Sequence, residues 1–149
     1  MKLVENVPLD TKIIEELIAD KDDMFLVWPI AKFPFDHEQW REKLTKDKRN
    51  ISLLLYKDNL LIGQGALIKT KNEDEYALSF LYIIPELRSQ GYGEKMIELL
   101  EKYAKDNLNA KQLCLVVRTY NPRGLKCYLK CGFKEIGRED TLIKMNKRI

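Results

Sequence analysis

The sequence predicts an α/β fold, with a mixed central sheet of about six to seven strands flanked by about four helices. Two observations carry this prediction. Strand and helix signals follow one another in the order β-α-α-β-β-β-α-β-α-β-β, so helices separate the later strands. The residues from Glu75 to Val117 have the pattern of a strand, a glycine-rich turn, a helix and a second strand, which is a βαβ unit with a right-handed crossover.

The N-terminal segment predicts a short strand and a capped helix. Lys2 to Val7 has the composition of a strand. Asp10 can cap a helix from Thr11 to about Asp20, because a side-chain oxygen at that place accepts from the free N–H groups of the first turn. Four apolar residues share one face of this helix: Ile13, Ile14, Leu17 and Ile18.

An irregular apolar connection is expected before the second helix. Met24 to Phe35 contains two prolines, which interrupt helical hydrogen bonding. Asp36 then has the position of an N-cap, and Gln39, three residues on, has the position of its capping-box partner. The helix behind this cap runs to about Thr45.

Three strands follow in succession. Ile51 to Tyr56 and Leu60 to Lys69 are joined by Asp58-Asn59, a tight-turn pair because both residues tolerate left-handed backbone conformations. The third strand runs from Glu75 to Ile84 and ends because the next residue is a proline, which has no N–H to donate. The second strand contains two glycines that mark a bulge or a close approach: Gly63 and Gly65.

The last third of the chain predicts two helices and three strands. Glu94 to Asn107 has an apolar helical face. Leu113 to Val117 is a short continuous apolar run, as expected of a strand buried on both faces. Asn121 and Pro122 open a helix as N-cap and first residue, and Gly132 ends it as a left-handed C-cap. The two closing strands are Phe133 to Arg138 and Thr141 to Met145.

Composition and charge limit the class of protein. A chain of 149 residues, 45% apolar and 33% charged, predicts one globular domain, residues 1–149. A net charge of +3 without a basic cluster argues against nucleic acid as a partner. There is no signal-peptide pattern and no apolar run of about 18 residues for a membrane span. One histidine and three cysteines provide neither a disulfide framework nor a metal-ligand set, so a cytoplasmic protein with reduced thiols and no metal is expected.

The turn Arg88-Ser89-Gln90-Gly91-Tyr92-Gly93 predicts an anion site. It lies between a strand and a helix, and the first four N–H groups of a helix have no partner within it. The helix dipole adds about half a positive charge there, the glycines permit close approach of a phosphate, and Arg88 adds a charge at the mouth. Together these groups would hold a diphosphate without a metal. The turn lacks both the Gly-Lys-Ser/Thr of a P-loop and the dinucleotide pattern, so it belongs to neither of those phosphate-binding motifs.

Two segments resemble motifs of the GNAT family of N-acetyltransferases. Tyr82 to Gly93 is similar to motif A, an Arg/Gln-x-x-Gly-x-Gly/Ala pattern after a long strand. Asn121 to Phe133 is similar to motif B, which combines an asparagine, a small residue, a tyrosine and a Gly-Phe pair. The motifs stand in the order and at the spacing of the family, and the element order resembles it over the whole chain. Gly124 stands where the family usually has alanine.

The resemblance implies a fold, an activity and a set of site residues. The implied fold is the GNAT (acyl-CoA N-acyltransferase) fold. The implied activity is direct transfer of the acetyl group of acetyl-CoA, the co-substrate, to a primary amine. The motif A strand and the strand after its helix splay apart, and the pantetheine arm of CoA pairs with exposed backbone in the gap. The residues implied in binding CoA are Leu81, Tyr82, Ile83, Arg88, Ser89, Gln90, Gly91, Tyr92, Gly93, Glu94, Asn121 and Tyr128.

Two groups are implied in the chemistry itself. The backbone N–H of Ile83 would polarise the thioester carbonyl as an oxyanion-type donor. Tyr128 would protonate the departing thiolate, since an ordinary tyrosine is protonated at neutral pH. No general base is assigned, because Glu75, Glu86 and His37 are candidates by position alone and surface carboxylates are usually just solvated.

The acceptor side leaves alternatives open. Phe25 to Phe35, with Trp40 behind it, either walls an apolar acceptor pocket or fills the core, because aromatic residues dominate both. The cysteines are expected as buried apolar side chains. Besides an acetyltransferase acting on a small-molecule or peptide amine, as a monomer or a homodimer, the sequence allows a non-catalytic CoA-binding or sensing module and a protein-interaction domain on the same fold.

Overall fold

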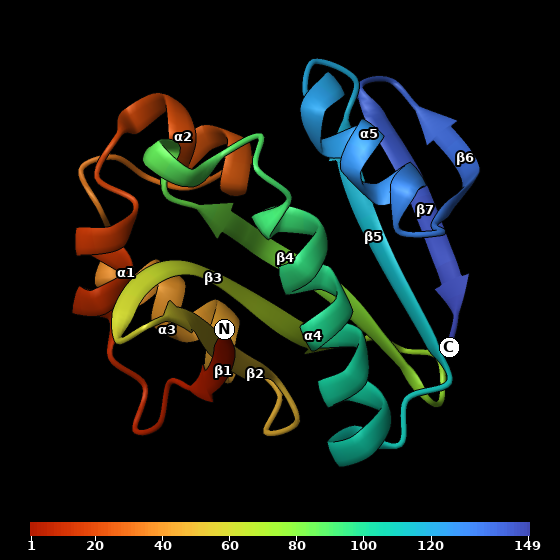
Figure 1. Ribbon diagram of the computed structural model, residues 1–149, viewed down its shortest axis with the longest axis horizontal. Helices are drawn as coiled ribbons and strands as arrows, with labels where there is room; N and C mark the ends of the chain where they lie inside the picture. Colours follow the sequence, from red (N-terminus) through yellow and green to blue (C-terminus); the bar gives the residue numbers. More distant parts are fainter.

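The computed structural model describes residues 1–149 as a seven-stranded sheet with helices on both faces (Figure 1). This confirms the predicted α/β class. The strands are β1 (Lys2–Glu5), β2 (Ile51–Lys57), β3 (Leu60–Lys69), β4 (Glu75–Ile83), β5 (Gln112–Arg118), β6 (Lys134–Glu139) and β7 (Leu142–Arg148). The helices are α1 (Thr11–Leu17), α2 (Lys21–Val27), α3 (His37–Thr45), α4 (Tyr92–Leu108) and α5 (Pro122–Lys130), with a 3-10 turn η1 (Pro85–Leu87) before α4.

The order of strands across the sheet is β1-β2-β3-β4-β5-β7-β6. Every neighbouring pair is antiparallel except β4 and β5, which are parallel. The chain between these two strands forms η1 and α4, so the predicted βαβ unit from Glu75 to Val117 is confirmed. A parallel pair at the centre of the sheet places the start of α4 beside the carboxyl end of β4, where ligands bind in open α/β sheets.

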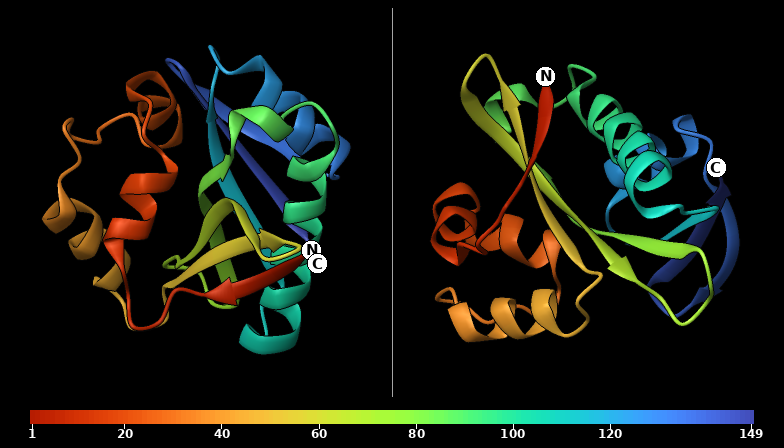
Figure 2. Two further views of the ribbon diagram at one scale, coloured as in Figure 1. Left: turned by 60° about the vertical axis from the view of Figure 1, so that its left-hand side comes forward. Right: turned by 90° about the horizontal axis from the view of Figure 1, so that it is seen from below.

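The helices form two separate layers (Figure 2). α4 and α5 lie on one face, where Leu100 of α4 joins Leu55 and Leu67 of the sheet in the larger core. α1, α2 and α3 lie on the other face, where Trp40 and Ile14 belong to a smaller core over β3 and β4. Consequently the half of the sheet formed by β5, β7 and β6 has helices on the α4/α5 face alone.

The two parallel strands separate soon after they begin. Their ladder comprises Glu75–Ala77 against Gln112–Cys114, although β4 continues to Ile83 and β5 to Arg118. Through its carboxylate, Glu75, which is 6% exposed, stabilises the end of β4 that pairs with β5. It accepts hydrogen bonds from Gln112 at 2.6 Å and from Thr70 and Asn72 at 2.8 Å each. Beyond this point the facing edges of β4 and β5 have no strand partner.

A bulge in β4 accompanies the separation. Two residues of β4 stand opposite one of β3 between the register pairs Ser79–Ala66 and Tyr82–Gln64. Phe80 in the bulge has φ = 58°, a conformation that bulky side chains rarely adopt. The buried side-chain amide of Gln64 donates to the Phe80 carbonyl at 3.0 Å and so satisfies a group that the ladder leaves free. The extra residue shifts the alternation of side chains. Leu78, before the bulge, lies in the larger core, whereas Phe80 and Tyr82 lie in the core under α1–α3.

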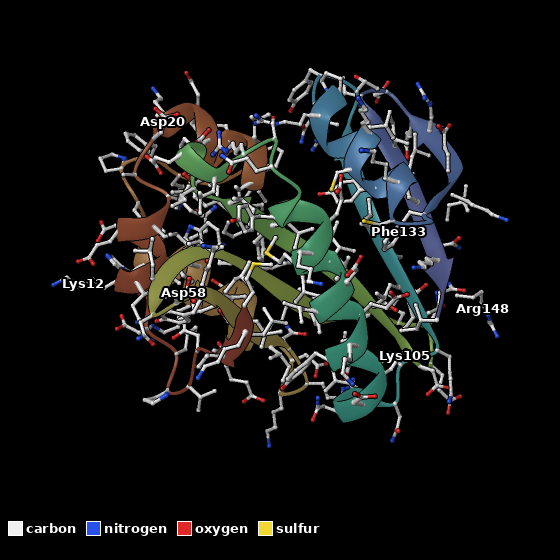
Figure 3. The ribbon with its side chains drawn as sticks, in the orientation of Figure 1. Lys12, Asp20, Asp58, Lys105, Phe133 and Arg148 are labelled. Carbon is white, nitrogen blue, oxygen red and sulfur yellow. The ribbon has the colours of Figure 1, made fainter.

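The structure contains one helix that the sequence did not predict. The helix expected from Thr11 to about Asp20 ends at Leu17, and Asp20 instead caps α2, accepting from the N–H of Asp23 at 2.9 Å (Figure 3). The expectation of irregular backbone from Met24 is therefore wrong as far as Val27. Acidic residues in the first turn of α2 favour a helix start at this place.

The cap of α3 is partly as predicted. The side chain of Asp36 accepts from the N–H of Gln39 at 3.0 Å, as an N-cap does. The side chain of Gln39 does not return to Asp36, so the capping-box prediction is wrong. Its amide accepts from the N–H of Lys32 at 2.8 Å and donates to the carbonyl of Ile30 at 2.9 Å. Gln39 thus holds the loop between α2 and α3 against the helix.

β5 is buried on one face, whereas the sequence predicts burial on both. Leu113, Leu115 and Val117 lie in the core under α4. Val116, which points the other way, is 54% exposed. No helix of the α1–α3 layer covers β5, so a continuous apolar run here marks the wall of an opening and not the centre of a layered core.

The turn signals at the end of α5 are confirmed. Gly132 has φ = 93°, the left-handed conformation expected of its place after the helix. The N–H of Phe133 donates to the carbonyl of Tyr128 at 3.0 Å, and the N–H of Gly132 donates to that of Leu129 at 3.1 Å, which is the Schellman pattern. Phe133 is 2% exposed and packs edge-on against Tyr128 (Figure 3). This closing turn fixes the last turn of the helix that carries Tyr128.

Candidate active site

The separated strands border a cleft of about 1000 Å³. Its walls come from the end of α2, from β4 and β5, from the turn before α4, and from α5 and β7. Gly93 and Tyr128 line it on the face that carries α4 and α5, and Trp28 lines it on the face that carries α1–α3. The cleft therefore passes through the sheet, and two molecules can enter it from opposite faces.

The turn before α4 presents a row of free backbone donors. None of the N–H groups from Ser89 to Glu94 has an acceptor within the protein, whereas the N–H of Lys95 donates to the carbonyl of Gly91 and begins the helix. Ser89 and Gly91 have left-handed φ values of 60° and 88°, and such residues curve a row of N–H groups into a concave nest. α4 has 17 residues, so its dipole adds positive potential at the same place. The turn predicted from sequence is thus built to receive an anion.

The side chain of Arg88 has a partner within the protein. Its Nη2 lies 2.8 Å from Oδ2 of Asp23 in α2, its Nη1 lies 3.3 Å from Oδ1, and its Nε donates to the carbonyl of Ile83 at 2.9 Å. Tyr82 donates its hydroxyl to the same carboxylate at 3.1 Å. Asp23 therefore neutralises the charge that the sequence placed at the mouth of the turn, and Arg88 joins α2 to the end of β4.

Burial and charge shift the pKa values of this network in the expected directions. Burial raises the pKa of Tyr82 to about 12, and the carboxylate of Asp23 adds to the effect. Burial alone would raise the pKa of Asp23, but the hydrogen bonds and charge of Arg88 outweigh it and hold the pKa below its usual value. The carboxylate is therefore ionised at neutral pH, as its ion pair requires.

The cleft edge of β4 carries the backbone groups that were predicted to meet the thioester. The N–H of Ile84 donates to the carbonyl of Ile62 in β3. Because the backbone groups of successive residues point to opposite edges of a strand, the N–H of Ile83 points away from β3, toward the separated strand β5. Leu81, Tyr82 and Ile83 all line the cleft, and the side chain of Tyr82 lies in the core beneath α2.

Tyr128 lies in the cleft wall on α5. Its hydroxyl makes no hydrogen bond within the protein. Burial raises the pKa of this phenol, with the neighbouring Cys127 and Cys131 adding to the effect. A raised pKa keeps the group protonated at neutral pH, as a proton donor must be.

Asn121 caps α5 and also lines the cleft. Its Oδ1 accepts from the N–H of Gly124 at 3.1 Å, and its Nδ2 has no partner within the protein. A Cβ at position 124 would lie 2.7 Å from Nδ2 of Asn121, so alanine there would displace the capping side chain. The glycine that stands at this place, where the family usually has alanine, therefore suits the observed position of Asn121.

A family model described as the acetyltransferase (GNAT) family matches residues 14–133 of the chain. The chain belongs to the GNAT family. The family resemblance, the fold and an acetyltransferase class of enzyme are thereby confirmed. The element order of the structure differs from the predicted order by two additions, the helix α2 and the short turn η1 before α4.

Solved GNAT structures share the fold over nearly the whole chain. Spermidine N-acetyltransferase from Vibrio cholerae, in complex with CoA and spermine, matches with a TM-score of 0.78 and 20% sequence identity, over 99% of this chain and 94% of that one. The N-acetyltransferase PseH of Campylobacter jejuni matches with 0.73 and 21% identity, over 99% and 96%. Its complex with acetyl coenzyme A gives 0.72 and 21%, over 99% and 97%.

The residues of this GNAT cleft fit a CoA thioester. The free N–H row from Ser89 to Glu94 suits a diphosphate, and the unpaired edges of β4 and β5 suit an amide-containing arm. At Gly93 an added Cβ would lie 3.5 Å from Sγ of Cys127, so the start of α4 packs closely against the middle of α5 beside the row. The side chains of His, Cys, Asp and Glu form no group of three or more able to hold a metal ion. None of the helices combines the length and apolar composition needed to cross a membrane.

Three groups considered as bases lie apart from the cleft or are occupied. Glu75 borders the cleft, but its three hydrogen bonds hold it ionised, with its pKa lowered despite burial. Glu86 is exposed on η1, outside the cleft lining. His37 lies outside it as well, with Nδ1 at 2.8 Å from Oγ1 of Thr11 and Nε2 at 3.3 Å from Glu15. None is placed to act on a substrate amine directly.

The aromatic segment divides between the two roles considered for it. Leu26, Trp28 and Pro29 line the cleft on the α2 side. Trp40 and Phe35 stack on one another, with ring centroids 5.5 Å apart, and belong to the smaller core. Trp28 serves both, because its ring also packs edge-on against Trp40 at 4.9 Å. This wall of the cleft therefore rests directly on the core.

Sequence reasoning missed several cleft residues that lie far from the two motifs. Asp23 is 65 positions from Arg88, and no local signal pairs them. Arg118 and Lys144 line the cleft from β5 and β7, where they look like ordinary exposed residues of strand ends. The alternation of buried and exposed positions in β5 places Arg118 on the open face, but the sequence carries no signal for it, because Leu113 to Val117 is a continuous apolar run.

Proposed function

We propose that this chain transfers an acetyl group from acetyl-CoA directly to a primary amine, with residues 1–149 acting as one acetyltransferase domain. The row of unpartnered N–H groups from Ser89 to Glu94 carries the proposal, because it opens onto the same cleft as Tyr128. A diphosphate on this row and an extended arm along β4 bring a thioester between Ile83 and Tyr128. The amine enters from the opposite face, past Trp28.

The proposed reaction uses few protein groups. The neutral amine nitrogen attacks the thioester carbonyl carbon, and a C–N bond forms as the C–S bond breaks. The N–H of Ile83 stabilises the negative charge that develops on the carbonyl oxygen. Tyr128 gives its proton to the departing thiolate, the nitrogen releases a proton to water, and Tyr128 regains one from water.

Binding of acetyl-CoA is the first test. A ligand at about 100 times its Kd stabilises a protein by about 2.7 kcal/mol, which for a chain of this size raises Tm by about 5–10 °C. We expect such a shift in thermal unfolding, together with release of free thiol when a suitable amine is added. The absence of any shift contradicts the proposal. A shift without thiol release from any amine in a broad panel favours the non-catalytic binding module.

The variant Tyr128→Phe tests the proton donor. We expect kcat to fall by about 10²-fold, while the acetyl-CoA affinity measured by calorimetry stays within about twofold. Tyr120→Phe is the matched control, since Tyr120 is 55% exposed, lies in the turn before the same helix and does not line the cleft. Weaker acetyl-CoA binding with unchanged chemistry in Tyr128→Phe contradicts the assigned role.

A further inference from the structure

The carboxylates of the cleft all have partners. Three acidic residues line the cleft. One of them, Asp23, pairs with Arg88 at 2.8 Å. Glu75 is buried and accepts three hydrogen bonds. Glu94 lies 3.7 Å from Lys130. An acceptor that carries a second positive charge, as a polyamine does, needs unpaired carboxylates to hold that charge. This cleft offers none.

The cations of the cleft outnumber these carboxylates, and several have no partner. Seven basic side chains line it: Lys43, Arg88, Arg118, Arg123, Lys126, Lys130 and Lys144. Arg88 and Lys130 pair with the carboxylates named above. Lys144 has a loose contact with the exposed Glu139 at 3.9 Å. The remaining four have no carboxylate within ion-pair distance, so the cleft has an excess of positive charge that the protein does not neutralise.

Two of the seven cations, Arg118 and Lys144, come from adjacent strands and lie on the face opposite α4 and α5. Leu115 and Val117 are buried under α4, so the alternating residues Val116 and Arg118 face the other way. Lys144 is the register partner of Val116, and paired residues of antiparallel strands share a face. Arg118 and Lys144 are therefore diagonal neighbours, about 7–8 Å apart at the backbone, on the face from which the acceptor enters.

Arg118 is held in position without being neutralised. Its Nη1 donates to Oγ1 of Thr141 at 3.0 Å, which ties the side chain to the turn between β6 and β7. The guanidinium keeps further N–H donors in a planar fork, the geometry that matches a carboxylate or a phosphate. Lys144 adds a mobile charge beside it.

We propose that the acceptor amine also carries an anionic group, a carboxylate or a phosphate, and that Arg118 binds this group with Lys144 beside it. The inference rests on the proposed function, because it names the substrate class of that site. It separates this chain from the Vibrio cholerae relative that was solved with spermine. The anion, and not the amine alone, orients the acceptor toward the thioester.

Four amines of similar length test the proposal. They are 4-aminobutanoate, 3-aminopropyl phosphate, butylamine and 1,4-diaminobutane, which end in a carboxylate, a phosphate, a methyl group and an ammonium. Each is measured by thiol release with acetyl-CoA, and by the thermal shift it adds to the protein saturated with CoA. We expect one or both anionic amines to exceed butylamine by about tenfold or more in kcat/KM or affinity, and the diamine to be poorest. The better anion identifies carboxylate or phosphate as the source. Equal or better use of butylamine or the diamine overturns the proposal, as does the absence of any response to either anionic amine.

The variant Arg118→Gln assigns the effect to the residue. We expect it to remove most of the preference for the anionic amine, about a tenfold loss or more, with acetyl-CoA binding unchanged. Arg138→Gln is the control, because Arg138 is an exposed arginine on β6 that pairs with Glu135 and does not line the cleft. An equal loss in both variants refutes a specific role for Arg118. A failure of acetyl-CoA to stabilise the unmodified protein would instead refute the proposed function, so the two failures are distinguishable.

Discussion

Replacing Asp23 by asparagine tests how firmly α2 is held to the end of β4. The change keeps the shape of the side chain but removes the charge opposite Arg88. The side chains of Asp23 and Arg88 are 13% and 21% exposed, and their closest contact is 2.8 Å. Removing one partner of a fully buried pair costs about 3–5 kcal/mol. Because both side chains retain some contact with water and asparagine still offers one oxygen, we expect a loss of about 2 kcal/mol.

Urea unfolding of Asp23→Asn at about neutral pH measures this loss as a lower midpoint. The pH dependence is a second check. The pKa of Asp23 is lower in the folded protein than its usual value, so the ion pair stabilises the protein fully above about pH 4 and progressively less as the pH falls through the folded pKa. The difference between the variant and the unmodified protein should therefore be constant from about pH 5 to 8 and shrink below about pH 4.

Asp106→Asn is the matched control. Asp106 and Lys102 meet at 2.6 Å on α4, but their side chains are 56% and 74% exposed, so removing this pair should leave stability nearly unchanged. The double variant Asp23→Asn/Arg88→Gln should lose less than the sum of its single variants, since it leaves no charge without a partner. A loss for Asp23→Asn below about 0.5 kcal/mol, or one that is the same at acid and neutral pH, would refute the reasoning.

Three further predictions concern the glycines of β3, Glu75 of β4 and two cysteines. Gly63→Ala should lower the free energy of unfolding by about 1–3 kcal/mol in urea titrations, because its Cβ would lie 2.5 Å from the carbonyl oxygen of Tyr82. Gly65→Ala should lower it less, because the added Cβ meets only movable side chains. A larger loss for Gly65→Ala than for Gly63→Ala would contradict this reasoning. Glu75→Gln should cost about 1–3 kcal/mol by the same measurement, since an amide NH₂ would face hydrogen-bond donors that now meet a carboxylate, and an unchanged midpoint would count against the clamp. Burial raises the pKa of Cys114 and Cys127 to about 12. Their alkylation by iodoacetamide should therefore be slow near neutral pH, and its rate should keep rising above about pH 9. An alkylation rate that levels off near about pH 9 would show thiols with an ordinary pKa.

Local signals predicted those parts of the fold that depend on neighbouring residues. Asp10, Asp36 and Asn121 each cap a helix through their own side chain, and Gly132 supplies the left-handed residue that ends α5. Such features involve a few consecutive residues, so their residue types are sufficient evidence. α2 was missed because no glycine or proline separates it from α1, and Asp20 looks like the end of one helix as much as the start of the next.

Contacts between distant segments could not be predicted from these signals. The turn from Arg88 to Gly93 was predicted at the right place between strand and helix, although α4 begins two residues earlier than expected, at Tyr92. The partner of Arg88, in contrast, comes from 65 positions earlier in the chain. The opening between β4 and β5 was expected from the family resemblance alone, because it depends on a bulge at Phe80, a residue type that does not favour a left-handed conformation. The proposed anion site at Arg118 and Lys144 likewise depends on the pairing of β5 with β7, whose register partners lie 24 to 36 positions apart in the chain.

The row of N–H groups at the start of α4 consists of main chain alone. Exchanging the side chains of Gln90 or Tyr92 leaves those donors where the backbone places them, whereas every group proposed to hold the acceptor is a side chain. The two halves of the cleft can therefore be redesigned separately. On the proposed assignment, a library confined to Arg118 and Lys144 would vary the amine that is chosen without changing the main-chain donors proposed to hold the diphosphate.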